Sequence, residues 1–284
     1  MCIVRLKLKS IAATVEQGPS KGGIMSVEYA RRGLIGALTP QANTTVEPEF
    51  QYLWPRGYAM INARMMSPKQ TIEERLIDYW GNVENELRQF ANAPIQAVAF
   101  GCTGTSYLVG KDREDEVVAR IYENHKLPFI TSAKAVCDAL DALKARRIGL
   151  VSCYPPSLTE KSIEYWQSRG FEVGDVSGRF NDESIFHPIY SLSAGTADEA
   201  LQQLKDKDID AIVMLGTGMP TLEPIARAAH WSGPPVMSCM LCLAWRTIQA
   251  VDGVEPNTAT VMDWVNGAHW APRLLADLEL LAAE

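Results

Sequence analysis

The chain has 284 residues, of which 47% are hydrophobic and 21% are charged, a composition typical of a soluble globular protein. Its formal net charge of -7 leaves no basic excess for a nucleic-acid backbone, and no apolar run approaches the roughly 20 residues that span a bilayer. Nucleic acid and membrane are therefore excluded as expected partners. Six cysteines without regular spacing favour free thiols in a reducing cytoplasm over a disulfide framework.

Residues 1–25 carry basic side chains but neither a continuous apolar core nor a convincing cleavage site, so we expect an extension outside the folded domain. After it, apolar strand-type runs beginning with GLIGALTP alternate with helical signals. Helices are expected over 71–91, 114–125, 157–170, 196–207 and 221–231. Thr71 with Glu74, and Ser157 with Glu160, have the spacing of capping boxes that begin helices.

The chain contains an internal repeat. The segments AVAFGCTGTS and AIVMLGTGMPT each pass from an apolar strand into a Gly/Thr turn, and Cys102 of the first corresponds to Gly216 of the second, 114 residues later. The segments GLIGALTP and IGLVSCYP form a second pair at nearly the same offset, and LPFITSAKAV and PPVMSCMLCL form a third. Three strand starts at nearly one offset indicate two homologous halves.

Strands that alternate with helices of this length form parallel sheets with helices on both faces. Together with the repeat, this predicts an α/β fold of two pseudo-symmetric, Rossmann-like (flavodoxin-like) halves, with the active site in the cleft between them. We expect the first half to comprise residues 26–131 and 240–284, and the second half residues 132–239. No Pro/Gly/Ser-rich linker separates the halves, so they are expected to pack tightly.

Several motifs resemble one family. The segments RRGLIGALTPQANTTVEPEF, FGCTGTS, RRIGLVSCYPPSLTE, FHPIY and GTGMPTLEPI are similar, in order and spacing, to those of maleate cis-trans isomerases and their relatives, the arylmalonate decarboxylases and Asp/Glu racemases. They span most of the chain from Arg31 to Trp245, and from them the chain is identified as a member of the Asp/Glu racemase superfamily. The resemblance implies a homo-oligomeric enzyme that acts on small carboxylates and needs neither cofactor nor metal.

Cys102 is the candidate catalytic residue. The resemblance implies two cysteines, one from each half, on opposite faces of a bound carboxylate; Cys102 matches the first, and Gly216 stands where the second is expected. A Gly/Thr loop that leads into a helix favours a thiolate at Cys102, because helix N-terminal amides lower the pKa of a thiol. The alternative is a small buried residue at a strand end. We therefore expect a one-sided site, limited to chemistry that a single thiol can complete.

The candidates for carboxylate binding in the two Gly/Thr loops are Thr103, Gly104, Thr217 and Gly218. Their backbone N–H groups and hydroxyls suit a carboxylate or a developing enediolate. The resemblance implies that Asn43 donates its amide to a second carboxylate and that Tyr154 hydrogen-bonds the substrate. From the residues alone, Asn43 can equally be a turn residue, and Tyr154 can be a packing residue.

Cys153 and Cys239 are the candidates to replace the second thiol, because each follows a strand closely enough to border the cleft. Cys239 and Cys242 have CxxC spacing, but neither a second such pair nor clustered histidines accompany them, so no metal site is expected. The chain also lacks GxGxxG and P-loop sequences, which leaves nucleotide binding without support.

Three functions remain open at this stage. In the first, Cys102 adds to the double bond of a small enedioate such as maleate, the enediolate rotates about the new single bond, and expulsion of the thiolate gives the trans product. In the second, a malonate-type acid loses one carboxylate and Cys102 protonates one face of the enediolate. The third is a non-catalytic carboxylate-binding protein. The segment NTTVEPEF favours the isomerase, because it resembles the maleate isomerases more than the decarboxylases.

Overall fold

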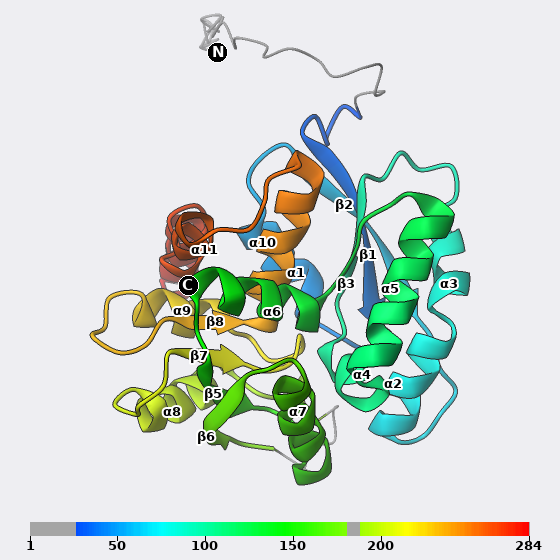
Figure 1. Ribbon diagram of the computed structural model, residues 1–284. Coiled ribbons are helices and arrows are strands. Elements are labelled where there is room, and N and C mark those ends of the chain that lie inside the picture. The colour runs from blue at the N-terminus through cyan, green and yellow to red at the C-terminus, as the bar shows by residue number, and fades with distance from the viewer. Residues whose placement is uncertain (1–26, 181–187, 284) are drawn as a thin grey trace, which may run out of the picture.

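The computed structural model describes residues 27–180 and 188–283. The expected extension at 1–25 and part of the FHPIY segment lie outside the described residues. Two four-stranded parallel sheets form the described part, with strand orders β2-β1-β3-β4 and β6-β5-β7-β8 (Figure 1). The two orders are the same when strands are counted from the start of each half. This confirms the predicted α/β fold of two pseudo-symmetric halves.

The first sheet and its helices comprise β1 (Gly33–Pro40), α1 (Val46–Leu53), β2 (Tyr58–Met65), α2 (Ile72–Gly81), α3 (Val83–Glu86), the 3-10 helix η1 (Leu87–Phe90), β3 (Ala97–Phe100), α4 (Thr103–Val109), α5 (Lys111–His125) and β4 (Phe129–Thr131). The second sheet follows α6 (Ser132–Leu143) and comprises β5 (Arg147–Ser152), α7 (Pro156–Ser168), β6 (Glu172–Gly178), α8 (Ala194–Leu204), β7 (Ala211–Met214), α9 (Leu222–Ala228) and β8 (Val236–Ser238). The chain ends in α10 (Cys239–Asp252), α11 (Thr258–Val265) and α12 (Ala271–Ala282).

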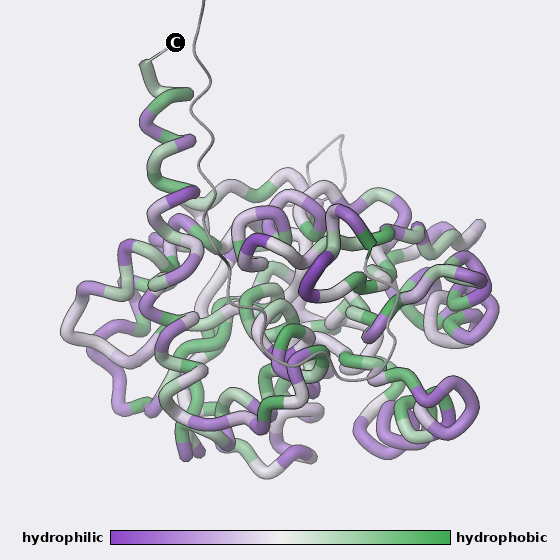
Figure 2. The backbone as a smooth tube through the Cα atoms, turned by 90° about the horizontal axis from the view of Figure 1, so that it is seen from above, coloured by the Kyte–Doolittle hydropathy of each residue, from purple (hydrophilic) through white to green (hydrophobic). Residues whose placement is uncertain are grey.

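The central strands are continuously apolar because helices cover both of their faces. Every residue of β1, β3 and β7 is buried, as expected of parallel strands in a doubly covered sheet. Figure 2 shows the hydrophobic segments gathered inside the molecule and the hydrophilic ones on its outer helices. No helix among the described residues combines the length and the apolar character needed to cross a membrane.

The first residues of α2 and α7 show which of the two predicted capping boxes form. Thr71 and Glu74 form the predicted capping box at the start of α2. The predicted helix over 71–91 is three consecutive pieces, α2, α3 and η1. The capping box predicted at Ser157 is wrong: α7 begins after Pro155 and has no side-chain cap. Proline accounts for this, since its fixed φ starts a helix without help from a side chain.

Helices α6 and α10 join the two halves. They follow the last strand of each sheet, pack against each other, and lie between the sheets (Figure 1). Helix α10 also contacts β3, β4 and α1, so the segment that follows the last strand returns to the first sheet. Each sheet is thus followed by a helix at the junction, which repeats the symmetry of the strands.

A buried ion pair also crosses between the halves. Glu114 on α5 is fully buried and lies 2.6 Å from the guanidinium of Arg169, which follows α7. The hydroxyls of Ser106 and Thr131 donate to the same carboxylate at 2.7 and 2.6 Å. Because loss of one partner would leave a charge buried without compensation, this network fixes α5 against α7.

Glu49 on α1 is buried against the loop that follows β7. The backbone N–H of Thr221 donates to its carboxylate at 2.6 Å, and the hydroxyl of Thr221 lies 3.2 Å from it. Burial raises the pKa of Glu49 to about 7, although the hydrogen bonds from Thr221 act in the opposite direction. The folded protein therefore prefers this carboxyl in its protonated form.

Glu49→Gln should change how stability depends on pH. The native pKa lies above that of the unfolded chain, so the contribution of Glu49 is full below about pH 4.5 and is lost as the pH rises through about 7, a difference of about 3 kcal/mol. The free energy of unfolding of the variant minus that of wild type, measured by urea denaturation, should increase by about that much between pH 5 and pH 8. The exposed Glu255→Gln is the control, with no such gain. Parallel pH curves for wild type and Glu49→Gln would contradict this assignment.

Candidate active site

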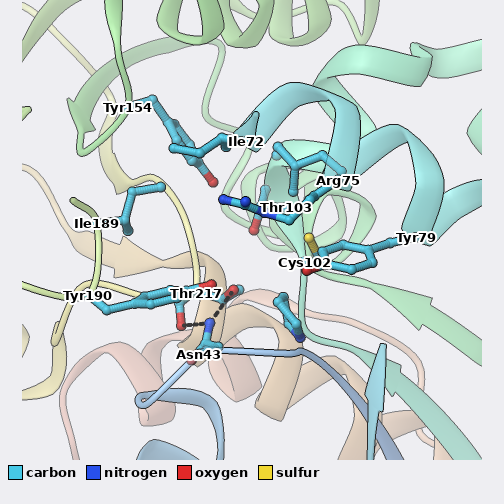
Figure 3. A pocket seen from close by; sticks show the side chains of 14 residues that line it. Asn43, Ile72, Arg75, Tyr79, Cys102, Thr103, Tyr154, Ile189, Tyr190 and Thr217 are labelled. Carbon is cyan, nitrogen blue, oxygen red and sulfur yellow. Dashed lines mark hydrogen bonds between the residues drawn. The ribbon is translucent and has the colours of Figure 1, made fainter. Parts of the chain in front are cut away.

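The loops that follow β3 and β7 meet at a cavity between the two sheets, with about 440 Å³ of space that includes its opening to solvent (Figure 3). It is lined by Pro40, Asn43, Ile72, Arg75, Leu76, Tyr79, Cys102, Thr103, Gly104, Tyr154, Ile189, Tyr190, Thr217 and Gly218. The cavity brings together the candidate catalytic cysteine and all six candidate binding residues.

Hydrogen bonds tie the two loops together across the cleft. The hydroxyl of Thr217 donates to the carbonyl of Gly101 at 2.8 Å, and the amide of Asn43 donates to the carbonyl of Thr217 at 3.0 Å (Figure 3). The hydroxyl of Thr45 donates to the carbonyl of Gly218 at 2.7 Å. All of these groups are buried, so each bond also avoids the cost of an unpaired polar group. The loops are therefore held at a fixed separation.

Cys102 caps the N-terminus of α4 and is only 3% exposed. Its sulfur lies 3.1 Å from the hydroxyl oxygen of Thr105, which itself reaches the carbonyl of Leu76 at 3.2 Å. Burial raises the pKa of Cys102 to about 11, and the hydroxyl and backbone N–H of Thr105 only partly offset it. In the unliganded site, loss of hydration therefore opposes the thiolate expected from the helix N-terminus, and the catalytic role of Cys102 stays a prediction.

Tyrosine hydroxyls surround the sulfur. Tyr79 lies beside Cys102 in the cavity wall, while Tyr154 stands on the other side (Figure 3). Burial raises the pKa of Tyr79 to about 12 and raises that of Tyr154 well above its usual range. Both phenols stay protonated at neutral pH and can donate to a substrate oxygen.

Gly216 has no room for a side chain. Its φ of +85° lies in the left-handed region that favours glycine. A Cβ at this position would lie 2.8 Å from the sulfur of Cys153 and 3.1 Å from the hydroxyl of Tyr154. Gly216 and Cys102 each stand two residues beyond the third strand of their half, β7 and β3. The equivalent position in the second loop is therefore occupied by neighbouring side chains.

The two candidate replacements for a second thiol lie outside the cavity lining. Cys153 and Cys239 are fully buried, and neither is among the lining residues. The thiol of Cys153 donates to the carbonyl of Leu215 at 3.2 Å, and burial raises the pKa of both cysteines. No cluster of His, Cys, Asp or Glu suited to a metal ion occurs in the described parts of the chain.

Sequence reasoning missed the contribution of α2. This helix presents Ile72, Arg75, Leu76 and Tyr79 to the cavity, at the i, i+3, i+4 and i+7 positions of one helical face. This spacing is visible in the sequence, but an amphipathic helix face normally indicates packing against the core. Only the contact between α2 and α4 shows that this face borders the ligand site.

The fold and the site define a class of protein: two like α/β halves that hold one cysteine and two Gly/Thr loops at the cleft between them. A family model for arylmalonate decarboxylase matches residues 35–261. The chain therefore belongs to the arylmalonate decarboxylase family.

Maleate isomerases are among its relatives. The one from Pseudomonas putida is 25% identical over 251 residues, which cover 83% of this chain and 98% of that protein. The crystal structure of a maleate isomerase from a Pseudomonas putida strain matches with a TM-score of 0.71 at 24% identity, covering 83% of this chain and 99% of that chain. A mutant of the Nocardia farcinica maleate cis-trans isomerase with a covalently bound succinylcysteine intermediate matches with a TM-score of 0.67 at 22% identity, covering 81% and 98%. Both structures share the fold described above.

Gly216→Ala should destabilise the protein. The new methyl group meets Cys153 and Tyr154, and the positive φ adds strain, together about 1–3 kcal/mol in the free energy of unfolding by urea. Gly81→Ala is the matched control, because a Cβ there meets nothing within 4 Å. Adding Cys153→Ala to Gly216→Ala should recover part of the loss. A Gly216→Ala variant as stable as wild type would contradict the described backbone.

Proposed function

We propose that this protein is a cis-trans isomerase of a small enedioate and that it converts maleate to fumarate. The observation that carries the proposal is the position of Cys102, which lines the cavity together with Gly/Thr loops from both halves. A nucleophile beside groups that bind carboxylates is the arrangement that addition to an enedioate needs. The maleate isomerases among the relatives support the same reaction.

The reaction needs one sulfur and no net proton. The Cys102 thiolate forms a bond to one alkene carbon, and the π electrons move through the other carbon into its carboxylate as an enediolate. Rotation about the carbon–carbon bond, now single, exchanges cis for trans. The electrons then return to re-form the double bond, and the carbon–sulfur bond breaks to release the thiolate.

The cavity offers donors for the enediolate. Thr103 is 1% exposed and lines the cavity, and its hydroxyl lies near the sulfur of Cys239. A hydroxyl in this position is available to donate to a ligand oxygen. Together with the phenol of Tyr154, it can meet the oxygen on which negative charge develops. Gly104 allows the loop to pack closely, since a Cβ there would lie 2.9 Å from Leu76 and 3.5 Å from the Tyr154 hydroxyl.

Cys102→Ser should abolish turnover. We expect the rate of fumarate formation from maleate, followed by NMR in heavy water, to fall by about 10³-fold or more, because a serine hydroxyl is far less nucleophilic than a thiolate. Cys137→Ser, away from the cavity lining, is the control and should keep wild-type activity. Activity retained in Cys102→Ser would exclude the proposed mechanism.

A decarboxylase is the second candidate, and the protonated state of Cys102 favours it. With a pKa of about 11, the sulfur carries its proton at neutral pH and is ready to act as an acid. The carbon–carbon bond to one carboxylate of a malonate would break, CO2 would leave, and the S–H would protonate the enediolate carbon. Phenylmalonate in the same heavy-water assay would then give a singly deuterated monoacid, whereas maleate would remain unchanged.

The pH profile separates the two reactions. Isomerisation requires the thiolate, whose fraction grows about tenfold per pH unit below a pKa of about 11, so kcat/KM for maleate should rise steeply from about pH 6 to pH 9. Protonation by the thiol requires the opposite state, so decarboxylation should stay level over the same range. A level profile for maleate isomerisation would contradict addition by a Cys102 that starts as the thiol.

The proposal includes a cellular location and an oligomeric state. Five cysteines of the described residues are free, which supports a reducing cytoplasm. Leu280 and Leu281 on α12 are 68% and 66% exposed, which supports burial of this helix in a homo-oligomer. A protein that turns over neither maleate nor phenylmalonate, yet binds dicarboxylates, would be the non-catalytic alternative.

A further inference from the structure

We propose that Arg75 binds the second carboxylate of the substrate and thereby selects a dicarboxylate whose two carboxylates both remain at the end of the reaction. The inference rests on the proposed function and adds a specificity residue to it. Arg75 lies on α2, 27 residues before the cysteine, and is half-buried in the cavity wall.

The guanidinium has donors that are not in use. Its Nη1 donates to the backbone carbonyls of Lys69 and Gln70 at 3.4 and 2.9 Å. Its Nε and Nη2 donate to no described residue. Figure 3 shows the side chain running from α2 into the cavity, on the side of Tyr154 and away from Asn43. A partly buried guanidinium with open donors is a site for an anion.

Asn43, which the resemblance assigns to the second carboxylate, is engaged in holding the loops. Its side-chain oxygen accepts from the backbone N–H groups of Thr45 and Val46 at 2.8 and 3.0 Å. Its amide nitrogen donates to the carbonyl of Thr217 at 3.0 Å. Arg75 is the one charged side chain among the described residues that line the cavity. Arg75 is therefore the residue available to pair with the second carboxylate of the substrate.

The distance along the helix suits a short dicarboxylate. Tyr79, beside Cys102, and Arg75 are about one turn apart on the same face of α2, about 6 Å of rise. The positive charge also acts inside the cavity: burial raises the pKa of Tyr79 and Tyr190, and Arg75 partly offsets that rise. A carboxylate at Arg75 thus leaves the adjacent carbons of the ligand near the sulfur.

The charge of Arg75 favours one of the two reactions. A carboxylate that departs as CO2 loses its charge, so a cation beside it stabilises the ground state more than the transition state and slows the step. In isomerisation both carboxylates keep their charge, and Arg75 assists binding without opposing the chemistry. The site is therefore suited to a dicarboxylate substrate that retains both carboxylates in the product.

The test compares maleate with maleamate, its cis half-amide, in wild type, Arg75→Gln and Arg75→Lys. Arg75→Gln should raise KM for maleate about 30-fold or more and leave kcat within about threefold, while kcat/KM for maleamate changes less than about threefold. Arg75→Lys should give an intermediate KM, because it keeps the charge but not the planar fork. The control is Arg56→Gln, an exposed arginine without a described partner. An unchanged KM for maleate, or equal losses for both substrates, would overturn the inference.

A binding assay keeps this test separate from the proposed function. If wild type fails to isomerise maleate, the proposed function fails, and the role of Arg75 is then read from protection of Cys102 against iodoacetamide at about pH 9. Succinate should protect wild type at concentrations about tenfold or more below those needed in Arg75→Gln, whereas succinamate should protect both alike. Labelling of the Cys102 peptide is measured by mass spectrometry. Equal protection by succinate in the two proteins overturns the inference.

Discussion

The hydrogen bonds between the two Gly/Thr loops are the constraint on which the site depends. Thr217 donates to the carbonyl beside Cys102 while it accepts from Asn43, so one residue of the second half is bound by two segments of the first. Thr45 adds a third link to Gly218. Because these groups are buried, they cannot exchange their partners for water without loss of stability. The separation of the sulfur from the opposite loop is therefore a property of the fold.

The same closure sets the chemistry of the sulfur. A loop packed this tightly excludes water from Cys102, and the lost hydration raises its pKa more than the hydrogen bonds from Thr105 lower it. The close packing also explains why the second loop carries glycine: Cys153 and Tyr154 occupy the space that a side chain of Gly216 would need. The one-sided site is thus a consequence of packing on both sides of the cleft.

Two features of the cavity act on different steps of a reaction. The protonated thiol is suited to deliver a proton, whereas the guanidinium of Arg75 is suited to hold a carboxylate that does not leave. An isomerase must therefore deprotonate Cys102 before the sulfur can add to the substrate, which raises the barrier of the reaction. The Thr105 hydroxyl lies beside the sulfur and can stabilise the thiolate once it forms.

The sequence by itself determined the repeat, the α/β class, the position of Cys102 and the two Gly/Thr loops. These features depend on local periodicity and on turns at strand ends, which neighbouring residues specify. Only the tertiary structure decided that α2 brings Arg75 and Tyr79 to the cavity, that Asn43 is engaged in tying loops, and that the thiol of Cys102 is protonated. Those outcomes depend on desolvation and on partners more than 20 residues away in the chain, which no local pattern encodes.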